Sequence, residues 1–461
     1  MLTSAANEGD QRATENKPPA SRCGAARRRG KFSIGTLVAV GLGLSGCAIK
    51  PPPGAAPAMA LTPVSVEALP GWRSDHVAAG VEAFQESCAR LLTLPADQKL
   101  GGHGLASARG GEAGQWSGAC TAARAVPEGD EAAARAFLAR YLEPYQVRSN
   151  GSASVLFSGY FEPEVAGSLR RTSRYDIPLY PRPPDLVQAD LGDFVPDLAG
   201  RLIAGRVRAG RLVPYYTRAE IRAGALDGED GALLWLADPI AAFVLQIQGS
   251  GRVKLPNGEL VRVGYAGKNG QPYVPIGRVL TERGDIPKGA VTLQSIEAWL
   301  RLHPGKADAV MDQNPSYVFF RILHGIPPDK GAPGALGVPL APGRALAVDE
   351  RFIPLGAPVW IATSAPAGGS PPAGSHALDR LMVAEDIGGA IKTPLRADIF
   401  FGWGASAKEQ AGRMDARGAE YVLLPRPAAA PTAGPAPVPR NSAGGPKVPL
   451  PIPPAPPRRA P

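Results

Sequence analysis

Three aspartates in the last third of the chain are the residues best placed to do chemistry. Asp349 follows the apolar run "ALAV", Asp386 closes "LMVAE", and Asp398 opens "IFFG". Apolar flanks shelter a carboxyl group and disfavour its charged form, so it can hold a proton near neutral pH. The pattern predicts a carboxyl group able to serve as a general acid, for instance at a glycosidic oxygen. An aspartate beside a glycine-rich turn can also do no more than cap that turn, and this alternative stays open.

Several other kinds of centre have no support in the sequence. The five histidines show no metal-ligand spacing, and no Cys-x-x-Cys pair occurs. No Gly-x-Ser-x-Gly elbow presents a serine nucleophile, and the glycine-rich "GYAGKNG" lacks the spacing of a phosphate loop. We therefore expect no metal and no cofactor.

A polar row is a candidate for binding sugar hydroxyl or amide groups. We predict a strand in "AAFVLQIQGSGRVKL" that carries Gln246 and Gln248 on one face and is continued by Ser250. A solvated sheet face is the alternative. Tyr160, Tyr215 and Tyr216 could stack on sugar rings, although aromatic residues more often belong to the core.

The chain is only mildly basic once its first 46 residues are set aside. The net charge is +9, and seven basic but only three acidic residues lie among the first 46. The small positive charge of the remaining residues would favour approach to an anionic polymer. No basic stripe is interleaved with aromatic residues, so we expect no binding to nucleic acid.

The N-terminus has the pattern of an export signal. Basic residues precede an apolar run of about 13 residues, too short to cross a bilayer but typical of a signal peptide. The run closes with Leu-Ser-Gly-Cys, which resembles a bacterial lipobox and implies cleavage before Cys47 and lipidation of its thiol. Ala48 favours the outer membrane, and paired arginines leave a twin-arginine export route open. A short buried apolar segment is the alternative reading.

Two further cysteines, Cys88 and Cys120, fall in the part of the chain predicted to fold. An exported protein meets conditions in which disulfides persist, so the two could pair. Spacing alone does not fix the geometry, and two buried free thiols are the alternative.

The predicted elements indicate a mainly β protein with a few helices. Helices are expected in "HVAAGVEAFQESCARLL", where Val77, Val81, Phe84, Cys88 and Leu91 have helical spacing, and in "EAAARAFLARYLEPY", capped by Asp130. Two more are expected in "TRAE", where Thr217 and Glu220 form a capping box, and in "VTLQSIEAWLRLHP". Most other segments are short strand-like runs broken by Gly and Pro, which favours antiparallel sheets or barrels over a doubly wound fold. The Pro/Ala-rich segment from 426 to 461 is expected to be disordered.

A set of motifs in this order resembles the membrane-bound lytic murein transglycosylase A family with its C-terminal three-aspartate domain. The motifs are "SGYFEPEV", "IPLYPRPPDL", "YYTRAEI", "WLADPIAAFVLQIQGSGRV", "VGYAGKNGQPYVPIGR", "DQNPSYVFFR", "AVDERFIPLGAPVWI" and "VAEDIGGAIKTPLRADIFFG". The resemblance covers roughly residues 68 to 425. The resemblance implies a double-psi β-barrel with an inserted second β domain and a groove between the two.

The resemblance also implies domain boundaries and site residues. The expected parts are a signal peptide (1–46), a tether (47–67), the first barrel part (68–164), the insert (165–312), the second barrel part (313–425) and the tail (426–461). Asp386 aligns with the family's catalytic aspartate, and Asp398 and Asp349 align with its companions. Ser158 and Tyr160 fall on the segment where the family contacts glycan. The predicted strand of Gln246 and Gln248, continued by Ser250, falls in the insert and would face the groove as a further substrate-binding row.

The activity that the resemblance implies is cleavage of peptidoglycan glycan strands without water. Asp386 would donate a proton to the oxygen between N-acetylmuramic acid and N-acetylglucosamine and then accept one from the muramyl 6-hydroxyl, leaving a 1,6-anhydro end. A hydrolase of lysozyme type and a non-catalytic wall-binding module are the alternatives. The expected setting is the periplasmic face of the outer membrane, and proteins of cell-wall synthesis or division are candidate partners.

Overall fold

The computed structural model describes residues 58–198, 201–227, 231–367 and 374–427. The predicted signal peptide with Cys47, and the Pro/Ala-rich tail, lie outside these residues. Within the described ranges, no helix is long and apolar enough to cross a membrane.

The larger of the sheets closes into a six-stranded barrel. Its order is β17-β14-β15-β13-β16-β3, and a further pairing of β17 with β3 completes the ring, while β2 and β1 extend from β17. Parallel pairs, β13 with β15 and β16 with β3, occur among antiparallel ones. The strands are β1 (Met59–Pro63), β2 (Leu142–Ser149), β3 (Val155–Glu162), β13 (Ala345–Val348), β14 (Pro358–Pro366), β15 (Ser375–Ile387), β16 (Arg396–Trp403) and β17 (Asp415–Pro425).

This ring confirms the predicted fold class, a mainly β chain with a barrel of the double-psi kind. The two ends of the folded chain build it together, because β2 and β3 precede the second sheet in sequence and β13 to β17 follow it.

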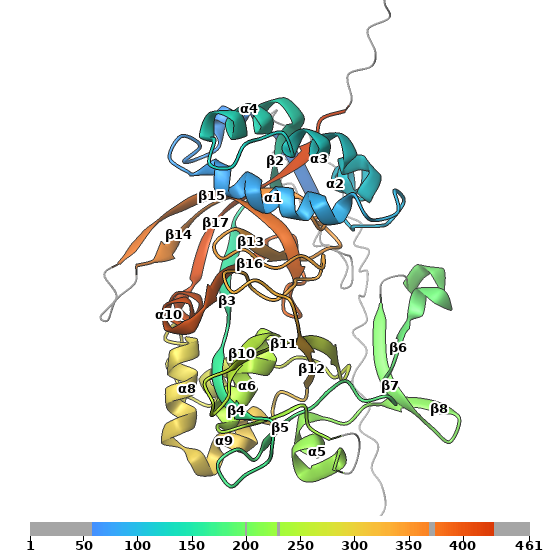
Figure 1. Ribbon diagram of the computed structural model, residues 1–461, viewed down its shortest axis with the longest axis vertical. Coiled ribbons are helices and arrows are strands. Elements are labelled where there is room, and N and C mark those ends of the chain that lie inside the picture. The colour runs from blue at the N-terminus through green and yellow to red at the C-terminus, as the bar shows by residue number, and fades with distance from the viewer. Residues whose placement is uncertain (1–57, 199–200, 228–230, 368–373, 428–461) are drawn as a thin grey trace, which may run out of the picture. The chain divides into compact units, whose positions relative to one another are not determined.

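Four helices cover one side of the barrel (Figure 1). They are α1 (Val77–Leu91), α2 (Leu105–Gly110), α3 (Ser117–Ala123) and α4 (Glu131–Tyr141), and α1 packs on β15. The predicted apolar spacing in α1 is confirmed, since Val77, Phe84 and Leu91 are all buried. The Asp130 carboxylate caps α4 by accepting a 2.9 Å hydrogen bond from the Ala133 N–H. The short helices α2 and α3 have no clear signal in the sequence.

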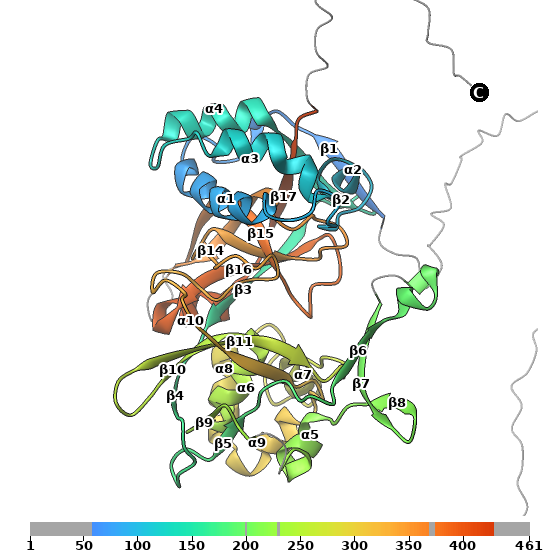
Figure 2. The same ribbon diagram turned by 45° about the vertical axis from the view of Figure 1, so that its right-hand side comes forward.

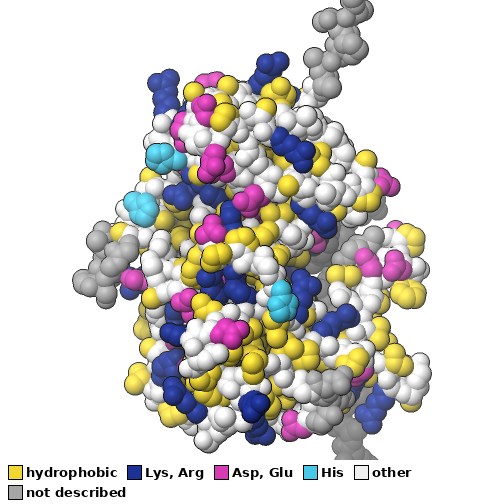
Figure 3. Space-filling model, in the orientation of Figure 1, with side chains coloured by type: hydrophobic (Ala, Val, Ile, Leu, Met, Phe, Trp, Pro, Cys, Tyr) yellow, Lys and Arg dark blue, Asp and Glu magenta, His cyan; other side chains and the backbone are white. Residues whose placement is uncertain are grey.

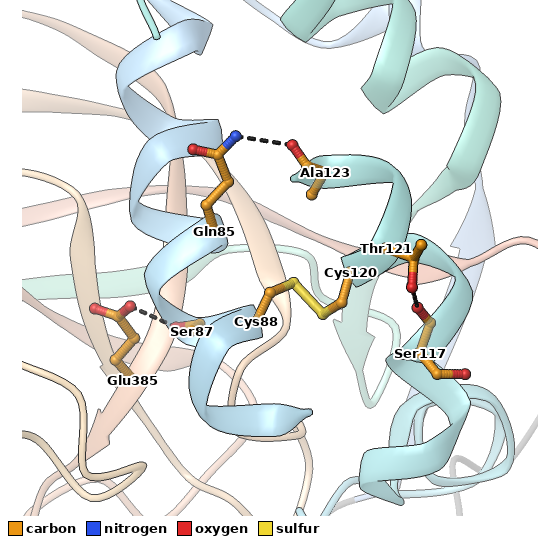
Figure 4. The surroundings of a disulfide bond; sticks show 8 residues. All are labelled: Gln85, Ser87, Cys88, Ser117, Cys120, Thr121, Ala123 and Glu385. Atoms are coloured by element: carbon orange, nitrogen blue, oxygen red, sulfur yellow. Dashed lines mark hydrogen bonds between the residues drawn. A yellow bond between two sulfur atoms is a disulfide. The ribbon is translucent and has the colours of Figure 1, made fainter. Parts of the chain in front are cut away.

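A disulfide joins two of these helices, as the exported setting had suggested. Cys88 of α1 and Cys120 of α3 are bonded, with their Cα atoms 5.1 Å apart (Figure 4). The Gln85 amide reinforces the contact by donating to the carbonyl of Ala123 at 2.8 Å. Both cysteines are fully buried, so the bond lies within the core between α1 and α3.

The second sheet has six strands in the order β12-β11-β10-β4-β9-β5. They are β4 (Glu164–Ser168), β5 (Ile177–Leu179), β9 (Leu234–Leu236), β10 (Gly251–Lys254), β11 (Leu260–Lys268) and β12 (Val318–Leu323). The helices of this region are α6 (Pro239–Gln248), α7 (Ile276–Glu282), α8 (Leu293–Leu302) and α9 (Pro304–Met311). The groove that the family resemblance implies between the barrel and this region remains a prediction.

The predicted strand through Gln246 and Gln248 is wrong, because this segment forms the helix α6. Asp238 caps it by accepting from the Ile240 N–H at 2.9 Å, Pro239 occupies the first turn, and Gly249 ends it in the left-handed conformation at φ 82°. These start and stop signals outweigh the strand-like run of apolar residues. On a helix, positions two apart face nearly opposite ways, so the two glutamines do not form a row.

A third, separate sheet of three antiparallel strands stands beside the six-stranded one (Figure 2). It consists of β6 (Val187–Asp190), β7 (Leu202–Arg208) and β8 (Arg211–Pro214). After it, the capping box of Thr217 and Glu220 predicted from "TRAE" forms at the start of the short helix α5 (Arg218–Glu220).

The barrel and the second sheet are joined by a buried ion cluster. Only Pro163 separates β3 from β4, and Glu162 just before it is fully buried. Its carboxylate accepts from Arg252 at 3.0 Å and from Arg262 at 3.1 Å, and from the Ala332 N–H at 2.6 Å. These contacts tie strands β10 and β11 to the end of β3.

A helix contact joins the same two regions. Gln294 of α8 donates to the Lys408 carbonyl in α10 (Gly404–Arg413) at 3.2 Å, and the Lys408 ammonium pairs with Glu297 at 2.7 Å. The second region is therefore held to the barrel both by the ion cluster and by this helix contact.

Candidate active site

Asp386 and Asp398 lie on two strands that flank the same short strand. In the register of the sheet, Ala347 of β13 is opposite Asp386 of β15 on one side and opposite Asp398 of β16 on the other. Residues opposite one another point to the same face, and two strand spacings place the two aspartate Cα atoms about 10 Å apart. The only side chain between them is a methyl group, so the two carboxyl groups share one face with little to separate them.

A β-bulge creates this register. Leu346 pairs with Ala384, but the next residue, Ala347, pairs with Asp386, so Glu385 is an extra residue on β15. A bulge turns the following side chain to the other face of the sheet. Without it, Asp386 would lie opposite Val348 and point away from Asp398.

The Asp386 carboxyl group is half-buried under the loop that precedes β13. One of its oxygens accepts a 3.1 Å hydrogen bond from the Ala335 N–H. The loop approaches so closely that a Cβ atom on Gly334 would lie 2.5 Å from the Glu385 carbonyl oxygen. Burial, with a smaller contribution from the Asp398 charge, raises the pKa of Asp386 to about 6, although backbone N–H groups and Tyr160 oppose this shift. Asp386 therefore keeps a protonated fraction near neutral pH that an ordinary aspartate lacks, and a general acid needs this fraction.

Asp398 has contacts of a different kind. It accepts a short hydrogen bond from the Ser158 hydroxyl, and its carboxylate lies 3.5 Å from the Arg396 guanidinium. Ser158 is its register partner on β3, which brings this residue into the same row. The two aspartates thus differ in surroundings, one sheltered by backbone and one paired with a cation.

Tyr160 lies at the edge of this group. Its ring packs on Phe400, with 5.2 Å between ring centroids, and its hydroxyl is enclosed without a standard hydrogen bond to any described group. Burial first, and then the Asp386 carboxylate, raise the pKa of the Tyr160 phenol. A neutral hydroxyl is therefore held close to Asp386.

Asp349 follows β13, two residues beyond Ala347, and its side-chain hydrogen bonds all go to Arg351. They join the carboxylate to the backbone N–H at 3.3 Å and to the guanidinium at 2.8 and 2.5 Å. Among the residues described, no hydrogen bond or ion pair connects Asp349 with Asp386. This geometry fits the turn-capping alternative better than a direct part in chemistry.

The predicted sugar-binding residues of the second region are dispersed. Gln246 is buried and accepts a 2.5 Å hydrogen bond from Arg218, while Gln248 accepts a 3.0 Å bond from the Phe161 N–H and so joins α6 to β3. Ser250 is half-buried in the turn before β10. Tyr215 is a core residue that packs on Phe319. Both glutamines are therefore engaged in internal hydrogen bonds.

Sequence reasoning missed Glu385 as a structural element of the site. It is fully buried, and one of its oxygens accepts a 2.6 Å hydrogen bond from Ser87 of α1 (Figure 4), while the other has no partner among the described residues. Burial raises the pKa of Glu385 to about 8. A neutral carboxylic acid therefore anchors the bulge to the helix layer.

Two other neighbours were missed, for different reasons. Arg396 had a signal, because it lies two residues before Asp398 and therefore on the same face of a strand. Ala347 had no such signal, because a short stretch of sequence does not show which strands become neighbours in a sheet. Among the described residues, no group of histidine, cysteine, aspartate or glutamate side chains is arranged to hold a metal ion.

Comparisons with known proteins place these residues within two family models. Residues 156–321 match the MltA specific insert domain, and residues 344–424 match the 3D domain. The second match contains Asp349, Asp386 and Asp398.

Curated relatives carry the name membrane-bound lytic murein transglycosylase A. The one from Vibrio cholerae is 31% identical over 263 residues, which are 56% of this chain and 62% of the relative. The one from Escherichia coli K12 is 32% identical over 280 residues, 60% of this chain and 67% of the relative. The aligned part thus spans about two thirds of these relatives.

Solved structures resemble the chain over a greater length. A membrane-bound lytic murein transglycosylase from Agrobacterium tumefaciens has 31% identity and a TM-score of 0.68, covering 80% of this chain and 98% of that one. The Escherichia coli MltA structure with bound chitohexaose has 28% identity and a TM-score of 0.56, covering 80% of this chain and 92% of that one.

Proposed function

Because the chain belongs to the membrane-bound lytic murein transglycosylase A family, we propose that it is a lytic transglycosylase that cleaves the glycan strands of peptidoglycan. The observation that carries this proposal is the pair of aspartates around Ala347. One of them, Asp386, is sheltered and has a pKa raised to about 6, and the other, Asp398, is paired with Arg396. Two carboxyl groups in unlike surroundings are suited to unlike roles.

In the proposed reaction, one carboxyl group first donates and then accepts a proton. Protonated Asp386 donates to the glycosidic oxygen between N-acetylmuramic acid and N-acetylglucosamine as the bond from that oxygen to the anomeric carbon breaks. The muramyl 6-hydroxyl then bonds to the anomeric carbon, and its proton passes to the Asp386 carboxylate. The product is a 1,6-anhydro end, water is not consumed, and Asp386 is again protonated. An intramolecular hydroxyl is at high effective concentration, which favours this route.

The neighbouring residues would support Asp386 rather than replace it. The charge of Asp398 helps to keep the Asp386 proton in place, and Ser158 and Arg396 hold Asp398 in position. Ser158 and Tyr160 remain proposed contacts to the glycan. For Asp349 we propose only a supporting role in shaping the end of β13.

The test is lysis of purified peptidoglycan by the Asp386→Asn variant. Removing general acid–base catalysis typically costs 10²- to 10⁴-fold, and here about 10⁴-fold or more is expected, because one group does both jobs. Asp379→Asn is the matched control, since Asp379 is on the same strand, its pKa is also raised by burial, and it lies seven residues, about 23 Å, away. Near-normal lysis by a folded Asp386→Asn protein would remove this residue from the mechanism.

The products decide between the transglycosylase and a hydrolase of lysozyme type. Anhydro ends carry no reducing group, so borohydride should leave the released muropeptides unmodified. Products that borohydride reduces would mean that water attacked, and would give Asp398 the role of a base or nucleophile. Binding without any lysis would favour a wall-binding module.

The proposal also covers the location of the protein and the boundaries of its domains. The relatives are named membrane-bound, and the lipobox-like sequence supports a lipid anchor at Cys47 on the periplasmic face of the outer membrane. We propose that an insert interrupts the barrel, which its strand order supports. We place the end of the insert near residue 323 instead of 312, because β12 (Val318–Leu323) pairs with β11 in the second sheet.

A further inference from the structure

The three-stranded sheet of β6, β7 and β8 presents apolar side chains outward instead of toward the protein. In its register, Val187 is opposite Gly205, Ala189 is opposite Ile203, and Val207 is opposite Leu212. One face therefore consists of aliphatic residues and glycine, and we call it the outer face. Its members are Val187, Ala189, Ile203, Gly205, Val207, Leu212 and Pro214.

The opposite face of the same sheet packs on the protein. Ala204 contacts the cluster around Tyr215, and the Arg206 guanidinium lies 3.5 Å from the centre of the Tyr216 ring. Since neighbouring residues on a strand point to opposite sides, the outer face is turned away from these contacts. Val207 is 62% exposed and Leu212 is 42% exposed. A half-buried sheet normally has the reverse arrangement, with its apolar face inside.

Exposed apolar side chains are concentrated in this sheet and its connections. Sixteen large hydrophobic side chains are exposed among the described residues, and seven of them lie between Val187 and Leu212. Contiguous apolar patches on a soluble surface usually mark an interaction site. Figure 3 shows hydrophobic and basic side chains together at the lower right, where the hairpin of β7 and β8 lies in the same orientation.

The tip of this hairpin has a positive charge that no described acid balances. Ala209 and Gly210 both have positive φ, 49° and 74°, as in a tight two-residue hairpin turn. The turn sets Arg208 directly opposite Arg211, and both are exposed without an ion pair to any described residue. Like charges directly opposite one another destabilise a strand pair. An anionic surface would relieve this repulsion.

We propose that the tip of this hairpin enters the surface of a bilayer that contains anionic phospholipid. Val207 and Leu212, at the end of the outer face, would lie on one side of the strand pair, and Arg208 and Arg211, which the register places on the opposite side, would lie at the same depth. A lipid surface fits both features, because aliphatic side chains enter the boundary of the acyl chains while arginine side chains extend to the phosphates. Glycan strands are polar and would not cover the aliphatic residues. A stable protein interface needs roughly 20–30 residues on each side, far more than this face provides.

The length of the chain before the fold agrees with a membrane nearby. Residue 58, the first described residue, lies eleven positions after Cys47, and an extended chain spans at most about 3.6 Å per residue. An anchor at Cys47, which is part of the proposed function, would keep the fold within about 40 Å of the bilayer. The sheet would then act as a second contact that orients the enzyme above the membrane.

The test places a fluorescent probe on the outer face of the full-length mature lipoprotein. With Cys88 and Cys120 bonded and Cys47 acylated, the variant Val207→Cys has a single free thiol for an environment-sensitive dye. Leu302→Cys is the matched control, because Leu302 is 76% exposed at the end of α8, outside this sheet. Both proteins are reconstituted into vesicles of phosphatidylethanolamine and phosphatidylglycerol that contain a spin-labelled lipid.

Quenching of the dye at position 207 several times stronger than at position 302 is the expected result. Replacing Arg208 and Arg211 by glutamine should weaken insertion roughly 30-fold on these vesicles and much less on vesicles without phosphatidylglycerol. Equal quenching at the two positions would overturn the proposal. A blue shift at position 207 that depends on protein concentration instead of lipid would overturn it in favour of contact with a second copy. Fractionation of a Cys47→Ser variant tests the anchor separately.

Discussion

Replacing Glu385 by glutamine should stabilise the protein, by an amount that grows with pH. The carboxyl group is 1% exposed, and burial raises its pKa from 4.5 to about 8. Below pH 4.5 it is neutral in both the folded and the unfolded chain, so it costs nothing. Between pH 4.5 and 8 the unfolded chain gains by ionising and the folded chain does not, so stability falls as pH rises.

The size of this effect follows from the two pKa values. Each pH unit in this window costs about 1.4 kcal/mol, so the penalty grows by about 4 kcal/mol between pH 5 and pH 8. Glutamine has the same shape and can still accept the hydrogen bond from Ser87, but it does not ionise. For a protein of this size we expect the melting temperature of the variant to exceed that of the wild type by roughly 4–8 °C at pH 8 and by little at pH 5.

The assay is thermal unfolding followed by circular dichroism at pH 5, 6, 7 and 8. Glu420→Gln is a positive control for the effect of pH on stability, since Glu420 is also buried, has a pKa raised to about 8 by burial alone, and lies on β17, away from the bulge. Both variants should show the growing difference, and Glu385→Gln should in addition keep its lytic activity, because the neutral form is preserved. A difference from wild type that stays constant between pH 5 and pH 8 would refute the idea that Glu385 is held neutral.

Three further outcomes are expected. Removing the disulfide with Cys88→Ala and Cys120→Ala should lower the free energy of unfolding by about 3–4 kcal/mol, because the bond closes a loop with a sequence separation of 32 and so limits the entropy of the unfolded chain. The loss should appear as a lower melting temperature. An unchanged melting temperature would mean that the bond is dispensable. Glu162→Gln should cost about 3–5 kcal/mol in denaturant titrations, because two buried arginines lose their counter-charge, and a cost below 1 kcal/mol would mean that water reaches them. Cys47→Ser should move the protein from the membrane to the soluble periplasmic fraction, and unchanged fractionation would exclude an anchor there.

Local patterns in the sequence predicted the elements whose signals are local. The apolar spacing of α1, the Asp130 cap of α4 and the capping box at Thr217 are all present. The failure at α6 has a specific cause. Its nearly continuous run of apolar residues suited a buried strand, and the deciding signals were the single residues at its ends, Asp238 and Gly249.

The site was predictable as a set of residue types but not as a geometry. Apolar flanks identified Asp386 and Asp398 as sheltered carboxyl groups. The two side chains share one face of the sheet because of the strand order β15-β13-β16 and the bulge at Glu385. Neither feature can be predicted from the local sequence. The same reasoning gave Asp349 equal weight, because apolar flanks do not show that the hydrogen bonds of its carboxylate go to Arg351.

The closed ring of strands also sets an order in which the protein can be made. Its last strand, β17, completes the barrel by pairing with β3 and β14, and it supports β2, whose residues are synthesised almost 280 positions earlier. Contacts between such distant segments form slowly, because the long intervening chain must first be brought together. The strands β2 and β3 therefore have unpaired edges until the rest of the chain has been synthesised. We expect the nascent protein to need a holding chaperone during this interval, and the second sheet, whose strands all lie between Glu164 and Leu323, to mature first.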